Sequence, residues 1–155
     1  MATWGQLEAS DAAMAAGGRA LLYQVGPVGL AFLGTVRKDG VARLHPVCPL
    51  LTDDRMYVFV IPSMKRNDLL RDGRYSLHSF PTPNNEDAFG ATGTASVVED
   101  AQTRDRLAAQ FAAERGGKLA PSDDDVLFEL SIDSCFLTRT TGHGDLHPVH
   151  QHWRV

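Results

Sequence analysis

The chain has 155 residues, of which 43% are hydrophobic and 22% charged, and its formal net charge at pH 7 is −4. This length favours one domain, and this composition excludes a disordered, collagen-like or coiled-coil chain. The acidic balance argues against a protein that follows nucleic-acid phosphates, no apolar run approaches the length of a membrane span, and the first residues lack a signal-peptide pattern. We therefore expect a cytoplasmic single domain over residues 1–155, with neither nucleic acid nor membrane as a partner.

The first segment has the pattern of an amphipathic helix over residues 1–23. Thr3 and Gln6 have the spacing of a capping box, and apolar side chains recur behind them at near-helical intervals. Because glycine is a poor helix former, the Gly17–Gly18 pair is expected to end or bend this helix.

A strand-rich pattern begins after Pro27. Three segments are rich in strand-forming residues and are separated by short turns: 28–36, 41–51 and 56–61. The dipeptide Asp39–Gly40 between the first two is a hairpin signal, so a meander is expected. Two-residue alternation places Arg43, His45 and Val47 on one face of the second strand.

The rest of the chain alternates between helical and strand patterns. The expected helices cover 64–71 and 100–115, and the expected strands cover 74–80, 89–99, 126–141 and 149–155. Gly90 and Gly93 predict a bulge or sharp bend in the strand over 89–99, and a break near Asp133–Ser134 is left open. About seven strands with three helices indicate an α+β protein built on a small closed barrel.

Nucleophilic and metal chemistry have little support in this sequence. Cys48 and Cys135 belong to no CxxC pair, and Cys48 lies among apolar neighbours, which favours an inert core thiol. His150 and His152 would share a strand face and could hold a transition metal, but no carboxylate or cysteine stands at a characteristic spacing. We therefore expect no metal site and identify no catalytic nucleophile.

The turn after residue 61 is the most informative local signal. Ser63 stands at the N-cap position of the helix over 64–71, and Lys65 and Arg66 follow within its first turn. The positive end of a helix dipole attracts anions and disfavours cations, so two cations in the first turn suggest that an anion binds there. Lys65 would add a full positive charge to such a phosphate site. The alternative interpretation is a solvated turn with two exposed cations.

Six runs carry a resemblance to a known family, in order and with matching spacing: 32–40, 43–47, 56–59, 63–69, 72–77 and 93–95. The first reads Phe-Leu-Gly-Thr-Val-Arg-Lys-Asp-Gly, and the fourth begins Ser-Met-Lys. Together they resemble the pyridoxamine 5′-phosphate oxidase family of FMN-binding split barrels, over about residues 25–115. The opening helix and the closing Trp153–Arg154 are similar to its small single-domain members, so residues 126–155 would supply closing strands and a C-terminal arm.

The resemblance implies an α+β fold with a small antiparallel split β-barrel of six to seven strands and flanking helices. It also implies a homodimer with FMN in a groove between the subunits. Ser63 and Lys65 would hold the phosphate, and Val60 and Ile61 would lie beside the isoalloxazine. The full set of expected cofactor-binding residues is Arg43, His45, Val47, Val60, Ile61, Ser63, Lys65, Trp153 and Arg154.

The expected function is a flavin-dependent oxidoreductase that transfers hydride to or from a small organic substrate. Where the true oxidase has an arginine, a lysine and a glutamine, this chain has His45, Leu50 and Ala88, so pyridoxamine phosphate oxidation itself is not expected. The alternatives are a deazaflavin-dependent reductase on the same fold and a non-catalytic flavin- or heme-binding protein. His45 and His78 are the nearest acid–base candidates, and both could equally be structural.

The last strand allows two interpretations. Its residues alternate, with Val149, Gln151 and Trp153 on one face and His150, His152 and Arg154 on the other. In the first interpretation the strand is an arm that crosses to the partner subunit and covers the flavin groove with Trp153 and Arg154. In the second, Trp153 plugs the open end of the barrel and Arg154 is solvated.

Overall fold

The computed structural model describes all residues from 1 to 155. Its elements are α1 (Trp4–Ser10), α2 (Ala12–Leu22), β1 (Ala31–Val36), β2 (Ala42–Val47), β3 (Leu50–Leu51), β4 (Met56–Val60), α3 (Met64–Arg71), β5 (Arg74–Ser79), β6 (Ala88–Val97), α4 (Ala101–Glu114), β7 (Val126–Arg139) and β8 (Val149–Arg154). Every expected element is present, but the segment over 41–51 forms two strands and the N-terminal segment forms two helices.

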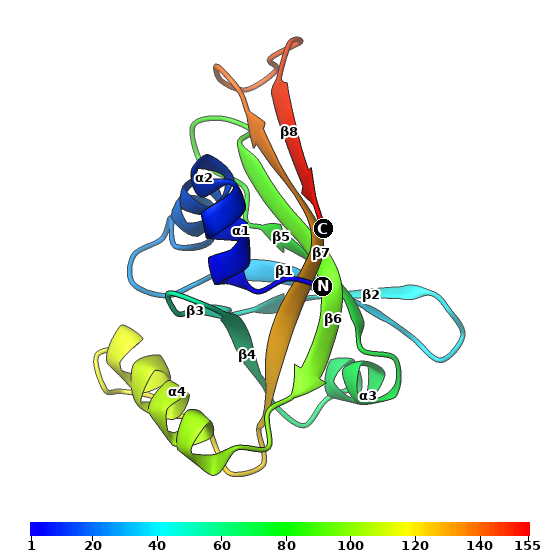
Figure 1. Cartoon of the computed structure of the whole chain (residues 1–155), viewed down its shortest axis with the longest axis vertical. Coiled ribbons are helices and arrows are strands. Elements are labelled where there is room, and N and C mark those ends of the chain that lie inside the picture. Colours follow the sequence, from blue (N-terminus) through cyan, green and yellow to red (C-terminus); the bar gives the residue numbers. More distant parts are fainter.

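One antiparallel sheet carries the fold (Figure 1), and its strand order is β2-β1-β5-β6-β7-β4-β3. The last strand, β8, pairs with the second half of β7, beyond the part of β7 that pairs with β4. The two end strands, β2 and β3, are joined through Cys48 and Pro49 but do not pair with each other. The architecture is therefore a split barrel, and the closed barrel suggested by the strand count is wrong.

The N-terminal helix breaks at Asp11 and not at the glycine pair. Asp11 ends α1 and also caps α2, because its carboxylate accepts a hydrogen bond of 2.9 Å from the amide of Met14. Gly17 and Gly18 lie inside α2, where a Cβ on Gly18 would stand 2.7 Å from the ring of Phe89. The predicted break there is wrong, because these glycines allow the helix to approach the sheet closely.

The hydrophobic core lies between the inner face of the sheet and the helix pair α1–α2. Trp4, Phe89 and Phe128 are its largest wholly buried side chains. The helix α4 covers the lower part of the sheet, where Leu107 packs in a separate small cluster with Leu127. None of the four helices is both long and apolar enough to span a membrane.

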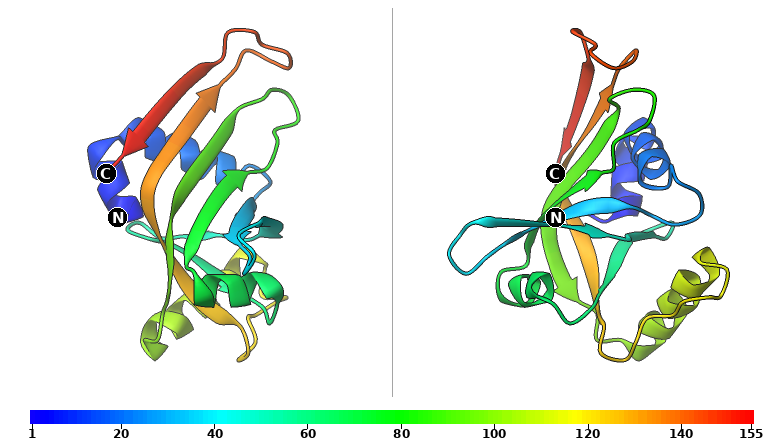
Figure 2. Two further views of the ribbon diagram at one scale, coloured as in Figure 1. Left: turned by 90° about the vertical axis from the view of Figure 1, so that its right-hand side faces the viewer. Right: turned by 180° about the vertical axis from the view of Figure 1, so that it is seen from behind.

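In the left view of Figure 2, no helix covers the upper part of the opposite face of β5, β6, β7 and β8, and α3 lies at its lower end. The register of β6 with β7 shifts between Thr92 and Gly93, and the residue left without a partner is Asp133, so the bulge predicted in β6 lies in β7. A Cβ on Gly93 would stand 1.8 Å from the carbonyl oxygen of Ser131, so only glycine fits without rearrangement. The strand β7 continues past Asp133, so the irregularity that its sequence left open near Asp133–Ser134 is this bulge and not a break.

Candidate functional site

The predicted cofactor residues fall into two groups that one chain does not bring together. Seven of them surround the start of α3, on β2, at the end of β4 and in the turn between β4 and α3. The other two, Trp153 and Arg154, lie on β8, which β7, β6, β5 and β1 separate from β2. A site that uses both groups needs a second copy of the chain.

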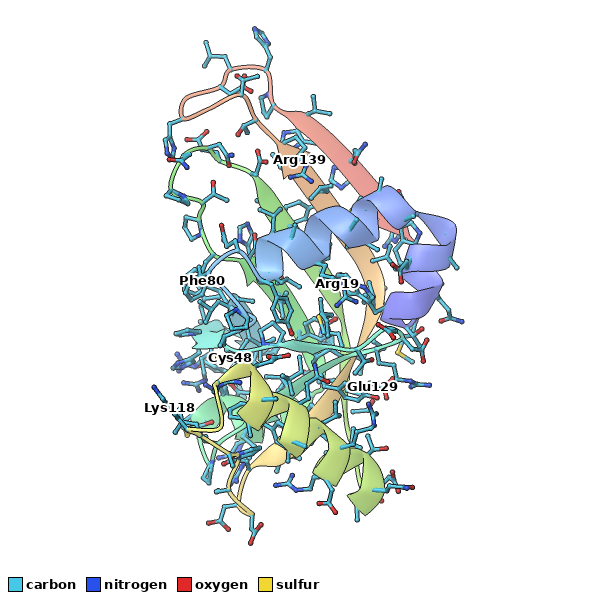
Figure 3. The ribbon with its side chains drawn as sticks, turned by 90° about the vertical axis from the view of Figure 1, so that its left-hand side faces the viewer. Arg19, Cys48, Phe80, Lys118, Glu129 and Arg139 are labelled. Carbon is cyan, nitrogen blue, oxygen red and sulfur yellow. The ribbon has the colours of Figure 1, made fainter.

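Lys65 is the unpaired cation of the first group. It lies in the first turn of α3, is partly buried and forms no ion pair or hydrogen bond within the chain. Burial lowers the pKa of its ammonium group, and the nearby Cys48 opposes this effect. Figure 3 shows Cys48 on the side of the molecule that α2 and α4 cover. Lys65 is thus a partly desolvated charge that nothing in its own chain neutralises.

Ser63 already has a local role. Its hydroxyl donates to the carbonyl oxygen of Ile61 at 2.8 Å and accepts from the amide of Arg66 at 3.4 Å, as expected for an N-cap. The Arg66 guanidinium donates to the carbonyl oxygen of Asp124 at 3.0 Å. Of the two cations in this turn, Arg66 is engaged and Lys65 is free.

Arg43 is held by a carboxylate that the sequence analysis missed. Its Nε donates at 2.7 Å to Asp68, a residue of α3 that is 3% exposed, and Thr35 and Arg71 also donate to that carboxylate. Burial raises the pKa of Asp68, but the hydrogen bonds from Arg43, Thr35 and Arg71 outweigh it and hold the pKa below its ordinary value. Arg43 therefore fixes α3 to the β1–β2 hairpin, and its charge is already compensated.

The remaining residues of the first group differ in what they offer a ligand. His45 is exposed and lies on the same face of β2 as Arg43, which confirms the predicted alternation. Val47 is buried and Val60 is wholly buried at 0% exposure, so neither presents a side chain to a ligand, whereas Ile61 is 58% exposed. Only His45 and Ile61 thus add free surface beside Lys65.

A basic groove lies between the β1–β2 hairpin and α3 and encloses about 490 Å³. Its lining residues are Arg37, Lys38, Asp39, Arg43, Met64, Asn67, Asp68 and Arg71. Lys38 forms no ion pair, while the arginines are paired with Asp39 or Asp68. Four cations against two carboxylates leave this groove with a positive balance, and Met64 connects it to the start of α3.

The second group is split between the two faces of β8, as the alternation predicted. Trp153 packs against the core, and its indole Nε1 donates to Ser10 Oγ at 2.6 Å, which favours the plug interpretation for this side chain. Arg154 lies on the other face, opposite Ser134, and forms no ion pair. Within one chain the strand is a part of its own sheet.

The acid–base and metal candidates do not converge. His45 stands opposite Leu33 on the inner face of the sheet, whereas His78 stands opposite Phe32 on the outer face. No three His, Cys, Asp or Glu side chains lie close enough to hold a metal ion. Burial raises the pKa of Cys135 to about 12, which makes its thiol unreactive.

Comparison with known proteins shows the fold. No family model matches the chain, and neither does any curated protein. A heme binding protein from Mycobacterium smegmatis (TM-score 0.64, 17% identity) covers 88% of this chain. An F420 reductase covers 77% of this chain, with a TM-score of 0.60 and 17% sequence identity. A putative pyridoxamine 5′-phosphate oxidase from Listeria innocua covers 76% of this chain, with a TM-score of 0.59 and 16% sequence identity.

These structures share the antiparallel split barrel with this chain. The chain spans 95% of the F420 reductase and 91% of the putative oxidase, but only 57% of the heme binding protein. Their identities are too low to transfer a cofactor. The fold is therefore the split barrel of pyridoxamine 5′-phosphate oxidase-like proteins, and the function has to be argued from the residues of this chain.

Proposed function

We propose that this protein is a flavin-dependent oxidoreductase that binds FMN and transfers hydride to or from a small organic substrate. The observation that carries the proposal is the unpaired, partly buried Lys65 in the first turn of α3. A lysine desolvated without a partner is unfavourable in the free protein, and a bound phosphate would compensate it. The amides at the start of α3 would add hydrogen-bond donors to the same phosphate.

The other residues of this region would orient the cofactor. Ile61 offers an exposed apolar side chain directly after β4, and His45 lies on the inner face of β2. Asp68 and Arg43 would act at one remove, because they fix α3 against the β1–β2 hairpin and so set the position of Lys65. Bound FMN would supply the hydride chemistry, and the protein would supply binding, orientation and exclusion of water.

We also propose that the active form is a homodimer. The Lys65 region and the β8 region lie at different places on one chain, so a two-fold partner is needed to complete one groove from both. The β2 end of the outer sheet face is apolar, with Leu44 65% exposed beside Pro46 and Phe32. Sedimentation of the cofactor-bound protein as a monomer at micromolar concentration would contradict this part of the proposal.

A deazaflavin coenzyme is the second candidate, and the basic groove favours it. This groove adjoins the start of α3 through Met64 and contains the unpaired Lys38, so it suits a cofactor with an anionic extension beyond its first phosphate. The known split barrel named F420 reductase has this fold, as does a heme binding protein. The chain's own groove, and not those names, is what supports the deazaflavin as a candidate.

The test is a cofactor titration. Purified protein is incubated separately with FMN, with the deazaflavin and with hemin, and the bound cofactor is measured by absorbance after gel filtration. We expect FMN to be retained, and retention to fall in Lys65→Ala. Retention of the deazaflavin alone would replace FMN by the second candidate, and a Soret band alone would refute flavin chemistry.

A further inference from the structure

A second pocket lies on the outer face of the sheet, apart from the Lys65 region of the same chain, and it includes Trp153 and Arg154 of β8. It encloses about 300 Å³ and is lined by Ser76, Gly90, Ala91, Thr92, Ser134, Cys135, Phe136, His152, Trp153 and Arg154. We call it the outer-face pocket. It crosses β5, β6, β7 and β8, the four strands that stand side by side in the left view of Figure 2.

The strand register builds the polar side of this pocket as one cross-strand row. Ser76 pairs with Thr92, Thr92 with Ser134 and Ser134 with Arg154. The hydroxyls of Thr92 and Ser134 are 2.8 Å apart and hydrogen-bonded, while Ser76 and Arg154 have no side-chain partner in the chain. Three hydroxyls and a free guanidinium therefore stand on one line along the sheet surface.

The neighbouring row is aromatic. His78 pairs with Gly90, Gly90 with Phe136 and Phe136 with His152. The ring centroid of Phe136 is 5.8 Å from that of His78 and 6.4 Å from that of His152. A Cβ on Gly90 would stand 2.2 Å from the Phe136 ring, so glycine lets this ring lie directly on the sheet. Three flat rings thus border the row of polar groups.

The charge of the pocket is one-sided. Arg154 is its only fully charged lining residue, and no carboxylate is among the lining residues. The nearest acidic residue along the strand, Asp133, lies outside the pocket lining. A guanidinium with unused donors matches a carboxylate in geometry, and hydroxyls can complete its hydrogen bonds.

We infer that the outer-face pocket binds a small aromatic carboxylate, with its anionic group at Arg154 and Ser134 and its ring beside Phe136 and His152. The volume is near the lower limit for ligand sites, which suits a single ring with one acidic substituent. The ring would gain contacts with the aromatic row, and the carboxylate would neutralise the free guanidinium. This inference does not depend on the identity of the cofactor.

The test compares a charged probe with its neutral isostere. Benzoate and benzamide are titrated separately against the full-length protein by ligand-detected NMR, in the wild type and in Arg154→Gln. The matched control is Arg74→Gln, because Arg74 is an exposed arginine on the same sheet that is engaged by Asp72 and lies outside the pocket lining. Arg154→Lys keeps the charge and shows whether the paired donors of arginine are needed.

We expect benzoate to bind the wild type about tenfold more tightly than benzamide, and Arg154→Gln to remove about that factor. Arg154→Lys should bind benzoate with intermediate affinity, and Arg74→Gln should match the wild type. Equal binding of benzoate and benzamide, unchanged benzoate binding in Arg154→Gln, or no binding of benzoate at all would each overturn the inference. FMN retention measured on the same samples reports separately on the proposed cofactor site.

Discussion

Replacing Lys65 by alanine tests whether this lysine binds a phosphate or is only a solvated side chain. The side chain makes no ion pair or hydrogen bond in its own chain, so its removal breaks no internal polar contact. Burial lowers the pKa of the ammonium group, which means that the charged form is disfavoured in the fold. The free energy of unfolding of the cofactor-free protein should therefore stay the same or rise slightly in Lys65→Ala.

The affinity for FMN should change in the opposite direction. A charge-assisted contact to a phosphate contributes about 1.5–3 kcal/mol, which corresponds to a weakening of about 10- to 150-fold in Lys65→Ala. Because the lysine pKa is lowered from 10.5, wild-type affinity should also fall with rising pH at a less alkaline value than an ordinary lysine would give. The alanine variant should lose this dependence.

The assay is quenching of FMN fluorescence on titration with protein, paired with thermal melts of the cofactor-free samples. Lys118→Ala is the control, since Lys118 is exposed in the segment between α4 and β7. Arg66→Ala should weaken FMN binding less than Lys65→Ala, because the guanidinium is engaged by Asp124. If Lys65→Ala and Lys118→Ala bind FMN equally well, the assignment of the phosphate to α3 is refuted.

Three further predictions concern the scaffold of the site. Asp68→Asn should lower the free energy of unfolding, measured by urea denaturation, by about 1.5–3 kcal/mol, because it leaves the Arg43 guanidinium without its anionic partner. The control is Asp39→Asn, which removes the carboxylate of an exposed ion pair and should change the free energy of unfolding little. The folded-state pKa of Asp68 is lowered, so the stabilisation that this carboxylate contributes is complete above the ordinary carboxyl pKa and is lost as pH falls through the lowered value. Melts that are unchanged on acidification would contradict this. Gly93→Ala should lower the free energy of unfolding by about 1–3 kcal/mol, because the added Cβ would collide with the carbonyl oxygen of Ser131. An unchanged melting temperature would contradict this prediction, since it would mean that the backbone of β6 moves to accommodate the Cβ.

Local signals in the sequence predicted most of the elements. Capping side chains mark helix starts whatever the tertiary context, and Thr3, Ser63 and Asp100 accept the expected amide hydrogen bonds. The helix over 64–71 was found in the same way, and Gly93 marks the height of the bulge, although the extra residue is Asp133 on the neighbouring strand. These features depend on neighbours a few residues away, which a single sequence shows.

What the sequence could not show depends on residues distant along the chain. The Gly17–Gly18 pair has the local pattern of a helix end, but the contact with Phe89 makes it a packing surface. Arg43 was expected at the phosphate, and the buried Asp68 that holds it lies 25 positions further along the chain. The outer-face pocket was also missed, because it exists only when four strands are placed in register.

The proposed flavin chemistry is tested most directly by the visible absorbance spectrum of the purified protein, saturated with FMN and then passed through gel filtration. We expect the two visible bands of oxidised FMN to elute with the wild-type protein in stoichiometric amount. We expect Lys65→Ala, treated identically, to elute with most of the FMN lost. A wild-type protein that elutes colourless after FMN saturation would contradict the central claim, as would one that retains heme but no flavin.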